Sequence, residues 1–467
     1  HDAINEHDIS SAKGKFYPTS HTGKNEKRSQ FFKASFDILD KYVLTATLRR
    51  DGTDKFFPGN KYALFPSVSG AWKISNENFL KNISWINLLK LRASWGKTGQ
   101  DNLGSSLYGS YAPNNFKVNF SDNGIINIPY VSMGANYPDV SWQKTTMKNI
   151  GLDFYLLSDR ISGSFDFFRN DITRLLGYAS TSPLAIYETR PINGGHYYRR
   201  GWELMVDTKN LVGEFTWDTS LTFSKTNSFW KERLPNYDYQ IYQQRENEPM
   251  SAYYYYNVTG IINTDRSNMP ESQKTLQAEA QLPGCPIIED KNKDGKIDEN
   301  DVYMKDNSPA IYVGIGNTFT YKRFEFSFFM YGQFGIQKYN IAYSAAQAGP
   351  LAVDYPENSN KFAYRLWNSQ TNPNGSRPGL AIGKMGALPG NAWVNADREN
   401  ASFMRMRNIT PAYNLAGNIL GSLQRYVRNI KVYVDAQNPF ILTKFQGFDP
   451  EIYTGGGGAS GGSRGEY

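Results

Sequence analysis

The segment from Asp290 to Asp301 has the residue types and the spacing of a calcium-binding loop. Gly295 stands where such a loop turns sharply, and Ca²⁺ takes about six to eight oxygen ligands at roughly 2.3–2.6 Å. The candidate ligands are five side chains and one main-chain carbonyl, that of Lys296: Asp290, Asn292, Asp294, Lys296, Asp298 and Asp301. We therefore expect structural calcium at these six residues.

The alternative for this segment is a solvated turn in which Asp and Asn side chains bond the nearby backbone and hold no metal. An EF-hand has Glu at the twelfth loop position, where this chain has Asp301, and it is flanked by amphipathic helices that are not evident here. The expected role is therefore to order a long loop and not to sense calcium. Accordingly, Asp294→Ala is expected to loosen the loop and leave the rest of the fold intact.

Other motifs that could carry chemistry are weak, and we predict that the chain is not an enzyme. Gly458–Gly462 has the G-x-S-x-G spacing around Ser460, but it lies in a glycine-rich stretch without the strand and helix that a nucleophile elbow needs. Cys285 is the single cysteine, so no intrachain disulfide can form, and we interpret it as a passive loop thiol. The four histidines lack the spacing of a zinc site: His1, His7, His21 and His196.

The segments that must position such loops show an alternation of apolar and polar residues with a period of two. This period is typical of a strand with one apolar face. If the strands cross a membrane, one set of side chains is expected to face lipid: Phe215, Trp217, Leu221, Phe223, Phe326 and Phe328. The alternate set is expected to face an aqueous lumen, because charges cost roughly 2–4 kcal/mol at the lipid midplane: Thr216, Asp218, Ser220, Glu325 and Ser327.

The strands form hairpins with short turns at one end and long connections at the other. Short turns are expected at Leu39–Lys41, near Ser158, and at Lys322–Arg323. The long connections are polar and rich in Gly, Pro, Asn and Tyr, and they span about 97–146, 170–199, 228–309 and 332–402. This asymmetry favours a transmembrane β-barrel with large extracellular loops over a soluble β-sandwich, which has modest loops at both ends. We expect 227–309 to be extracellular.

Composition agrees with an all-β chain and excludes several classes. The 467 residues have a mean hydropathy of −0.57 and no apolar run near the ~18 residues of a spanning helix, which excludes an α-helical membrane protein. The net charge of +7 comes from well-mixed charges, so no nucleic-acid-binding stripe is predicted. The 15% aromatic content fits interfacial girdles or a carbohydrate-binding surface. Tyr253–Tyr256 could stack on a ligand or pack in a girdle or loop.

Several blocks, in order, resemble one family, the SusC-like (SusC/RagA) TonB-dependent outer-membrane transporters of the Bacteroidetes. These blocks are Leu64–Trp72, Leu89–Gly99, Trp142–Thr146, Asn149–Asp153, Arg200–Leu204, Glu399–Thr410, Val432–Asn438 and Gly447–Glu451, with the calcium-like loop among them. The resemblance covers nearly the whole of 1–467 and implies the C-terminal part of a barrel of about 22 strands. The family's plug, TonB box and final strand have no counterpart in this chain.

The resemblance implies a function without covalent chemistry. It predicts active import of a bulky nutrient, an oligosaccharide or a peptide, across the cell outer membrane. The implied partners are a SusD-like surface lipoprotein over the long loops, which include 227–309, the TonB complex through the N-terminal part of the family, and outer-membrane lipid. Which residues bind substrate is unknown. The alternative from another class is a secreted all-β protein that binds or cleaves glycans.

Two prolines depart from the family pattern. Pro411 and Pro439 fall within expected strands, and proline cannot donate a ladder hydrogen bond. We therefore expect a bulge or a strand end at each of them.

Overall fold

The computed structural model describes most of residues 25–451 and contains, in that part, no helix that is both long and apolar enough to cross a membrane. The described range excludes 104–106, 108–110, 114–119, 123–124, 128–129, 133–135, 182–188, 236–238, 244–245, 341–360, 380–381, 383–384, 397, 417–420, 422–424, 428 and 448. The nucleophile-like stretch around Ser460 and three of the histidines, His1, His7 and His21, lie outside it.

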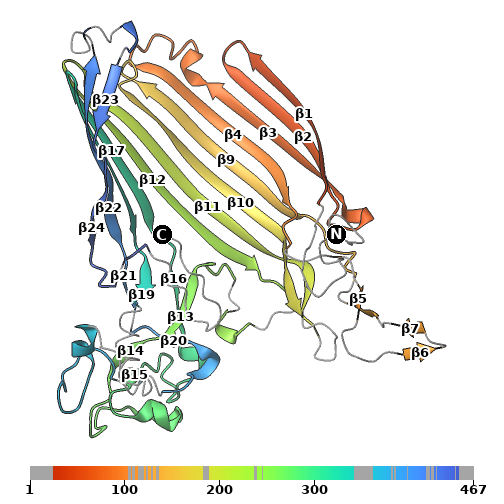
Figure 1. The fold of residues 1–467 in the computed structure, drawn as a ribbon, viewed down its shortest axis with the longest axis vertical. Helices are drawn as coiled ribbons and strands as arrows, with labels where there is room; N and C mark the ends of the chain where they lie inside the picture. Colours follow the sequence, from red (N-terminus) through yellow and green to blue (C-terminus); the bar gives the residue numbers. More distant parts are fainter. Residues whose placement is uncertain are drawn as a thin grey trace.

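One large antiparallel sheet, which we call the wall, dominates the structure (Figure 1). Its strands pair in the order β1-β2-β3-β4-β9-β10-β11-β12-β17-β18-β22-β23, and β24 also pairs with β22. Their bounds are β1 (Lys27–Ile38), β2 (Tyr42–Thr53), β3 (Tyr62–Lys73), β4 (Ile86–Gln100), β9 (Gln143–Leu156), β10 (Ile161–Ser180), β11 (Thr189–Leu211), β12 (Phe215–Glu232), β17 (Ile311–Tyr321), β18 (Phe324–Phe334), β22 (Phe403–Ala416), β23 (Asn429–Tyr433) and β24 (Ala436–Thr443).

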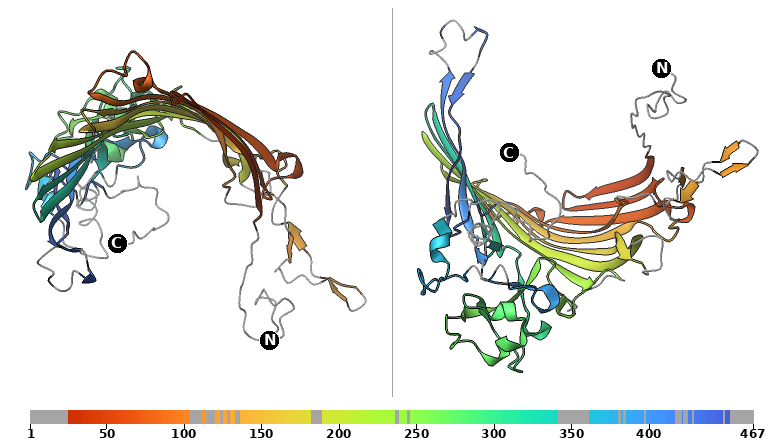
Figure 2. Two further views of the ribbon diagram at one scale, coloured as in Figure 1. Left: turned by 90° about the horizontal axis from the view of Figure 1, so that it is seen from above. Right: turned by 60° about the horizontal axis from the view of Figure 1, so that its bottom comes forward.

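The wall is a single curved layer and not a closed barrel. In the described residues β1 does not pair with β23 or β24, and Figure 2 shows the sheet as an open, arched trough. From β1 to β23 the strands of the wall pair in the order in which they follow one another in the chain, so the sheet is an up-and-down meander, and β24 pairs back onto β22. This arrangement agrees with the predicted all-β fold class.

The two ends of the wall differ as the sequence predicts. Short turns follow β1, β9, β11 and β17, and the predicted turns at Leu39–Lys41, Ser158 and Lys322–Arg323 are confirmed. The long connections lie at the opposite end, between β4 and β9, β12 and β17, and β18 and β22. The expected loop at 170–199 is wrong for most of its length. There β10 and β11 stay paired from Asp171 opposite Tyr198 to Ser180 opposite Thr189. Their backbone N–H and C=O groups hydrogen-bond to each other even where the neighbouring strands β9 and β12 have ended.

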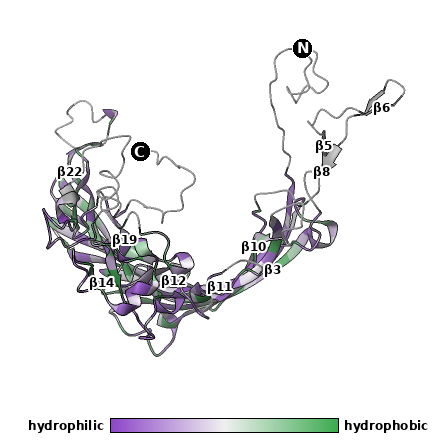
Figure 3. Cartoon of the chain, turned by 90° about the horizontal axis from the view of Figure 1, so that it is seen from below, coloured by the Kyte–Doolittle hydropathy of each residue, from purple (hydrophilic) through white to green (hydrophobic). Residues whose placement is uncertain are grey.

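The predicted separation of side chains between two faces is confirmed. Cross-strand pairing places Trp217 opposite Phe319 and Phe319 opposite Phe326, so these rings share one face. Asp218 and Glu325 are each one residue away and lie on the other face, and the remaining residues of the two predicted sets follow the same alternation. Figure 3 accordingly shows hydrophobic and hydrophilic residues mixed along the strands. We call these the outer, apolar face and the inner, polar face.

The two prolines have different outcomes. At Pro439 the prediction is confirmed, because the β22–β24 register shifts between Met406 and Asn408, where Asn438 and Pro439 lie on the opposite strand. At Pro411 it is wrong, since β22 continues through this residue and pairs it with Phe326. The interruption instead falls in the neighbouring strand, where β23 ends and β24 begins, and the Val434 N–H donates to the Pro411 carbonyl at 3.1 Å.

Two of the long connections fold together into a compact unit, which we call the loop domain (residues 240–306 with 385–394). Its small strands are β13 (Ala252–Tyr256), β14 (Val258–Ile261), β15 (Pro286–Ile288), β16 (Tyr303–Asp306) and β20 (Trp393–Val394). β13 pairs with β16 and, in parallel, with β20 from the other connection. A buried cluster that includes Ile262, Cys285, Ile288, Val302 and Leu388 forms its core.

The remaining elements are short. The 3-10 helices are η2 (Pro58–Asn60), η3 (Ile74–Asn76), η4 (Ile241–Gln243), η5 (Glu271–Thr275), η6 (Ala278–Gln281), η7 (Glu299–Asp301), η9 (Lys361–Arg365) and η11 (Pro389–Asn391), and the short strand pairs are β5 (Tyr111–Pro113) with β8 (Tyr130–Ser132), β6 (Phe120–Asp122) with β7 (Ile125–Asn127), and β19 (Gln337–Tyr339) with β21 (Arg398–Asn400). A second buried cluster, with Phe56, Phe65 and Trp142, lies where β2 and β3 meet the β4–β9 connection.

Candidate functional site

The calcium-like segment forms a tight turn in the loop domain, directly after β15. Both Asp290 oxygens accept backbone N–H groups, from Asp294 at 3.2 Å and from Gly295 at 2.9 Å, and the Asp294 carboxylate accepts the Lys296 N–H at 2.9 Å. Gly295 has a φ of +84°, which favours glycine at this turn. Asp301 is fully buried and accepts the Lys291 and Asp298 N–H groups, both at 2.9 Å, as part of a cap on η7.

These contacts leave calcium as a prediction. The donor set is all oxygen, which suits a hard cation, and each carboxylate keeps acceptor capacity beyond its backbone bonds. In the described part of the chain, however, no three His, Cys, Asp or Glu side chains are grouped so that they could hold a metal ion. The backbone bonds alone correspond to the alternative of a self-bonded turn. If calcium binds, it would be held by the six predicted residues and would fix this turn.

The inner face of the wall carries a network of ion pairs on three adjacent strands. Asp153 on β9 lies 2.7 Å from the Lys90 ammonium and 2.8 Å from the Arg92 guanidinium, both on β4. Arg92 also reaches Asp166 on β10 at 2.9 Å. Gly151 lies within this network, and a Cβ there would come 2.4 Å from the Asp166 carboxylate. The glycine therefore leaves room for Arg92 to cross β9, and the network gives the inner face a charged, hydrated character.

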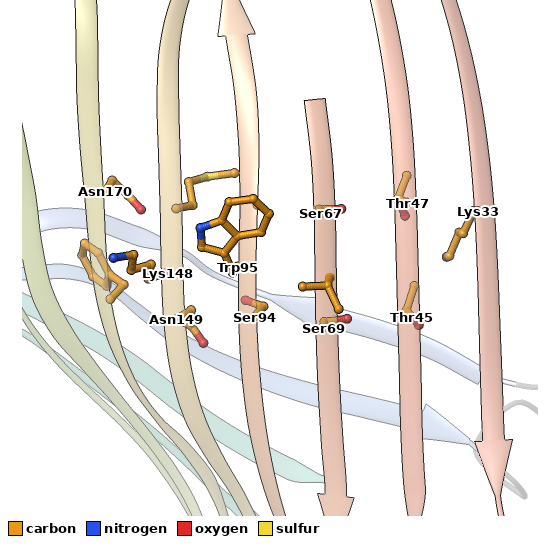
Figure 4. A pocket seen from close by; sticks show the side chains of 14 residues that line it. Lys33, Thr45, Thr47, Ser67, Ser69, Ser94, Trp95, Lys148, Asn149 and Asn170 are labelled. Carbon is orange, nitrogen blue, oxygen red and sulfur yellow. The ribbon is translucent and has the colours of Figure 1, made fainter. Parts of the chain in front are cut away.

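Nearer the loops, the inner face becomes a surface of hydroxyl and amide groups. A shallow pocket of about 460 Å³ opens along β1 to β10, and Figure 4 shows the side chains that line it. Gly96, Met147 and Phe168 lie on the inner face of this pocket, and its other inner-face residues are polar: Lys33, Thr45, Thr47, Ser67, Ser69, Ser94, Asn149 and Asn170. Such groups can exchange hydrogen bonds with a passing polar solute without holding it in one place.

A second, more specific cleft of about 620 Å³ lies beside the loop domain. Trp367, Arg398 and a set of amide side chains line it, among them Asn263 and Asn395. The Asn263 side-chain oxygen is buried without a hydrogen-bond partner in the described residues. Arg398 lies 3.6 Å from the centre of the Tyr253 ring, forms no ion pair with a described residue, and has a pKa lowered by burial. An aromatic ring, amides and an uncompensated cation are groups that bind polar ligands.

This cleft has no counterpart among the residues predicted from the sequence, which did not indicate where substrate binds. Its lining comes from the β12–β17 and the β18–β22 connections, which are far apart in the chain. The only local signal was the tyrosine run on β13. For two of its members loop packing is confirmed, because Tyr256 is buried in the loop-domain core and Tyr254 packs against that core. Tyr253 alternates to the other side, beneath Arg398.

A buried ionic contact connects the loop domain to the wall. The Arg233 guanidinium, just beyond β12, pairs with Glu248, whose side chain has no exposed surface, and the Tyr254 hydroxyl donates to the same carboxylate. A buried pair of this kind is costly to break on one side only. Nearby in the loop-domain core, burial raises the pKa of the Cys285 thiol to about 11, which agrees with a passive thiol.

Comparisons with known proteins agree with this architecture. The family model described as TonB dependent receptor-like, beta-barrel matches residues 4–439. TonB-dependent receptor P3 of Formosa agariphila is 28% identical over 448 residues, which are 93% of this chain and 43% of that protein. TonB-dependent receptor SusC of Bacteroides thetaiotaomicron is 29% identical over 449 residues, 94% of this chain and 42% of that protein. The chain thus spans less than half the length of these relatives.

Solved structures show the same fold. The RagAB peptide importer in its closed-closed state matches with a TM-score of 0.72 and 19% identity over 91% of this chain and 45% of that chain. A second structure, of the RagAB peptide transporter, gives a TM-score of 0.71 at 20% identity, over 91% of this chain and 45% of that one. The family match over residues 4–439 goes against the secreted alternative, because TonB-dependent receptors are outer-membrane proteins. The polar-faced and apolar-faced wall, its one-sided loops and the match over residues 4–439 together show that the chain belongs to the TonB-dependent receptor-like β-barrel family, is similar to SusC within it, and is an outer-membrane protein.

Proposed function

We propose that this chain forms the barrel part of an importer that takes up an oligosaccharide or a peptide across the outer membrane. TonB supplies the energy through the N-terminal part of the protein, and a SusD-like lipoprotein covers the long connections. The wall and the loops bind and guide the substrate and carry out no covalent chemistry. The similarity to SusC and to the RagAB fold supports this assignment.

The observation that carries the proposal is the difference between the two faces of a single-layer wall whose long connections are all at one end. The outer face presents rings such as Phe165 and Phe326, which suit lipid. The inner face presents the Arg92 network and the hydroxyl-lined pocket, which suit water and a polar solute. A wall of this kind can surround a passage through a bilayer.

The cleft at the loop domain supports capture of the substrate before passage. The Trp367 ring and the amides around it suit the faces and hydroxyls of a sugar, whereas the Arg398 guanidinium suits a peptide carboxylate. Both proposed substrate classes, an oligosaccharide and a peptide, therefore fit the chemistry of the cleft. The two side chains provide a way to distinguish them.

Uptake by the native bacterium tests the proposal. Chromosomal variants Trp367→Ala and Arg398→Gln are compared with wild type and with Tyr364→Ala, a control that changes an 88% exposed ring in the same connection. Cells receive a labelled oligosaccharide pool or a tryptic peptide pool, with and without a protonophore. We expect uptake of one pool to require the proton gradient, to fall at least tenfold in one cleft variant, and to stay unchanged in the control. If cells that lack the gene took up both pools as fast as wild-type cells do, the proposal would be contradicted.

The lipoprotein partner is tested by photo-crosslinking on intact cells. A photoreactive residue is placed at Trp393 or Ile241 in the loop domain, and at Val212 in a turn at the opposite end of the wall. All three side chains are more than half exposed. We expect a lipoprotein adduct from the first two positions and none from the third. Adducts from Val212 alone would place the loops on the wrong side of the membrane.

A further inference from the structure

Among the described residues, the outer face of the wall carries a row of four cations with a single acidic side chain, Asp171, beside it. Strand pairing places Lys148 on β9 opposite Arg169 on β10, and Arg169 opposite Arg200 on β11. Lys225 on β12 lies opposite Trp202 and thus one step diagonally from Arg200 on the same face. We call these four residues the basic row. Like charges directly opposite each other on adjacent strands repel, so a row of this kind needs an anion beside it.

The face of the basic row follows from the alternation along each strand. Each of its first three members has a neighbour two residues away on the same strand and the same face. These neighbours are Ile150 for Lys148, Phe167 for Arg169 and Trp202 for Arg200, and they are themselves cross-strand partners. Phe167 is 51% exposed and belongs to the outer, apolar face. The cations therefore continue the lipid-facing surface and do not point into the lumen.

Only one carboxylate contacts the row in the described residues. Asp171 pairs with Arg169 at 3.0 Å and with His196 at 3.5 Å. Lys148, Arg200 and Lys225 form no ion pair with a described residue, and Lys148 and Arg200 are exposed. Arg200 rests on the Phe229 ring at 5.2 Å, which holds its guanidinium against the wall. Three of the four positive charges are thus free to bind an external group.

The height of the row fits the outer boundary of the hydrocarbon layer. Arg169 is eight residues beyond Ile161, which begins β10 at the short-turn end. At about 3.3 Å per residue and a tilt of about 40°, this distance spans about 20 Å of membrane, close to the ~25 Å apolar band of such barrels. Counted from Ile161, the cations therefore lie near the outer edge of this band, on the side of the long connections, where charge on the lipid face costs little and long side chains can reach the lipid head groups.

The row has a boundary along the sheet. Beyond Lys148, the next cross-strand partners are Trp95 on β4 and then Val68 on β3, and neither is a cation. Figure 4 shows Trp95 and Lys148 side by side at this boundary. An indole at the edge of a cationic patch offers a polar N–H and an apolar ring at the depth where sugar head groups meet acyl chains. The patch is thus a localised site and not a general positive rim.

We propose that the basic row binds the phosphate groups of a phosphorylated glycolipid in the outer leaflet, with the acyl chains lying against Ile150, Phe167 and Trp202. Guanidinium groups bind phosphate through paired hydrogen bonds, and an ammonium adds a point charge. The phosphates relieve the repulsion within the row. This inference depends on the outer-membrane location and not on the transported substrate.

Binding of defined lipids to the detergent-purified full-length receptor tests the proposal. The probes are diphosphorylated lipid A, the same lipid A after phosphatase treatment, and phosphatidylglycerol, and native mass spectrometry gives the apparent affinities. The variant Lys148→Gln/Arg200→Gln removes two cations and keeps the Arg169–Asp171 pair. Arg199→Gln is the matched control, because it removes the neighbouring cation on the inner face.

We expect the double variant to bind diphosphorylated lipid A about 25-fold more weakly than wild type, at about fivefold per cation near a membrane surface. The control should bind as wild type does, and phosphatase treatment should weaken binding to wild type at least tenfold. Unchanged affinity in the double variant, or equal binding of phosphatase-treated lipid A, would overturn the proposal. Equally tight binding of phosphatidylglycerol would overturn the assignment to a glycolipid. If the double variant lacks the heat-modifiable band of a folded barrel, Arg200→Gln alone is measured, with an expected fivefold loss.

Discussion

The wall and the loop domain solve the problem of burying apolar side chains in opposite ways. In the loop domain, residues such as Tyr256, Ile262 and Ile288 are almost fully buried against one another. In the wall, rings such as Phe165 and Phe326 stay more than 40% exposed on the outer face. The difference reflects two surroundings of one chain, water around the loop domain and lipid around the outer face of the wall. The loop domain needs a core because it is in water, whereas the wall relies on backbone pairing and on lipid.

This comparison predicts that the two regions fail independently, and the largest effect is expected in the loop-domain core. Tyr256→Ala removes a fully buried ring whose hydroxyl donates toward the Asp298 carbonyl at 2.9 Å. We expect a loss of about 3–5 kcal/mol in loop-domain stability. Maleimide labelling of Cys285, the single cysteine, reports the loss because unfolding of the domain exposes that thiol.

The wall should not respond to that change. The heat-modifiable band of the folded barrel is expected to stay as in wild type, and Ile241→Ala, which truncates a 72% exposed side chain of the loop domain, should leave Cys285 protected. Loss of the heat-modifiable band in Tyr256→Ala would show that the two regions fold as one unit.

The converse experiment introduces a charge on the outer face of the wall. Phe165→Arg places a cation between Leu152 and Leu204, its cross-strand neighbours, and should cost roughly 2–4 kcal/mol of barrel stability. Ser164→Arg is the matched control on the inner face, where Asp153 is the cross-strand partner. Denaturant unfolding of the full-length protein in liposomes measures both. Equal destabilisation by the two substitutions would contradict the assignment of faces.

A smaller effect is expected from the proposed calcium. At a free concentration tenfold above Kd, a ligand stabilises the folded form by about 1.4 kcal/mol, and extracellular sites bind calcium with a Kd of about 10⁻⁴–10⁻³ M. Chelation should therefore lower the melting temperature of the loop domain and leave that of the barrel unchanged. In Asp294→Ala, chelation should no longer change the melting temperature of the loop domain. A well-resolved structure in millimolar calcium with only water between the six predicted ligands would contradict the calcium prediction and support the self-bonded turn without metal.

A further expected effect is a pH dependence of the loop domain that appears only at alkaline pH. Burial raises the pKa of Cys285 from 9.0 to about 11, so the folded domain holds a proton that the unfolded chain releases earlier. Loop-domain stability should therefore fall as the pH rises from about 9 to about 11, and it should not depend on this group below that range. Thermal melts of wild type and Cys285→Ala between pH 8 and 11 measure the difference, and identical pH slopes would contradict it.

The wall could be predicted from the sequence because lipid on one side and water on the other impose a period of two. The strand from Phe324 to Met330 and its hairpin partner from Val313 to Tyr321 follow directly from that period. The length of the β10–β11 hairpin was missed, because beyond the membrane its paired backbone no longer requires alternation. Pro411 was misjudged because the break falls in the neighbouring strand, a feature of pairing and not of local sequence.

The loop domain and its cleft were beyond the reach of the same reasoning. Its core joins Tyr256 and Leu388 from two separate connections, and irregular segments bury residues without a repeating period. The basic row was also hidden, since Lys148, Arg169 and Arg200 come together only through strand register. The calcium loop is the opposite case, because its spacing is visible in the sequence although its occupancy is a separate question.

Cysteine scanning along β12 tests the central claim, a wall with lipid on one face and water on the other, most directly. In a Cys285→Ser background, single cysteines replace each residue from Phe215 to Phe223 in the full-length protein in liposomes. We predict two interleaved sets. Odd positions such as Trp217 should carry a fluorophore that brominated lipid quenches, and even positions such as Asp218 should react with a charged, water-soluble thiol reagent. Quenching and reactivity that do not alternate, or that alternate in the opposite phase, would contradict the account.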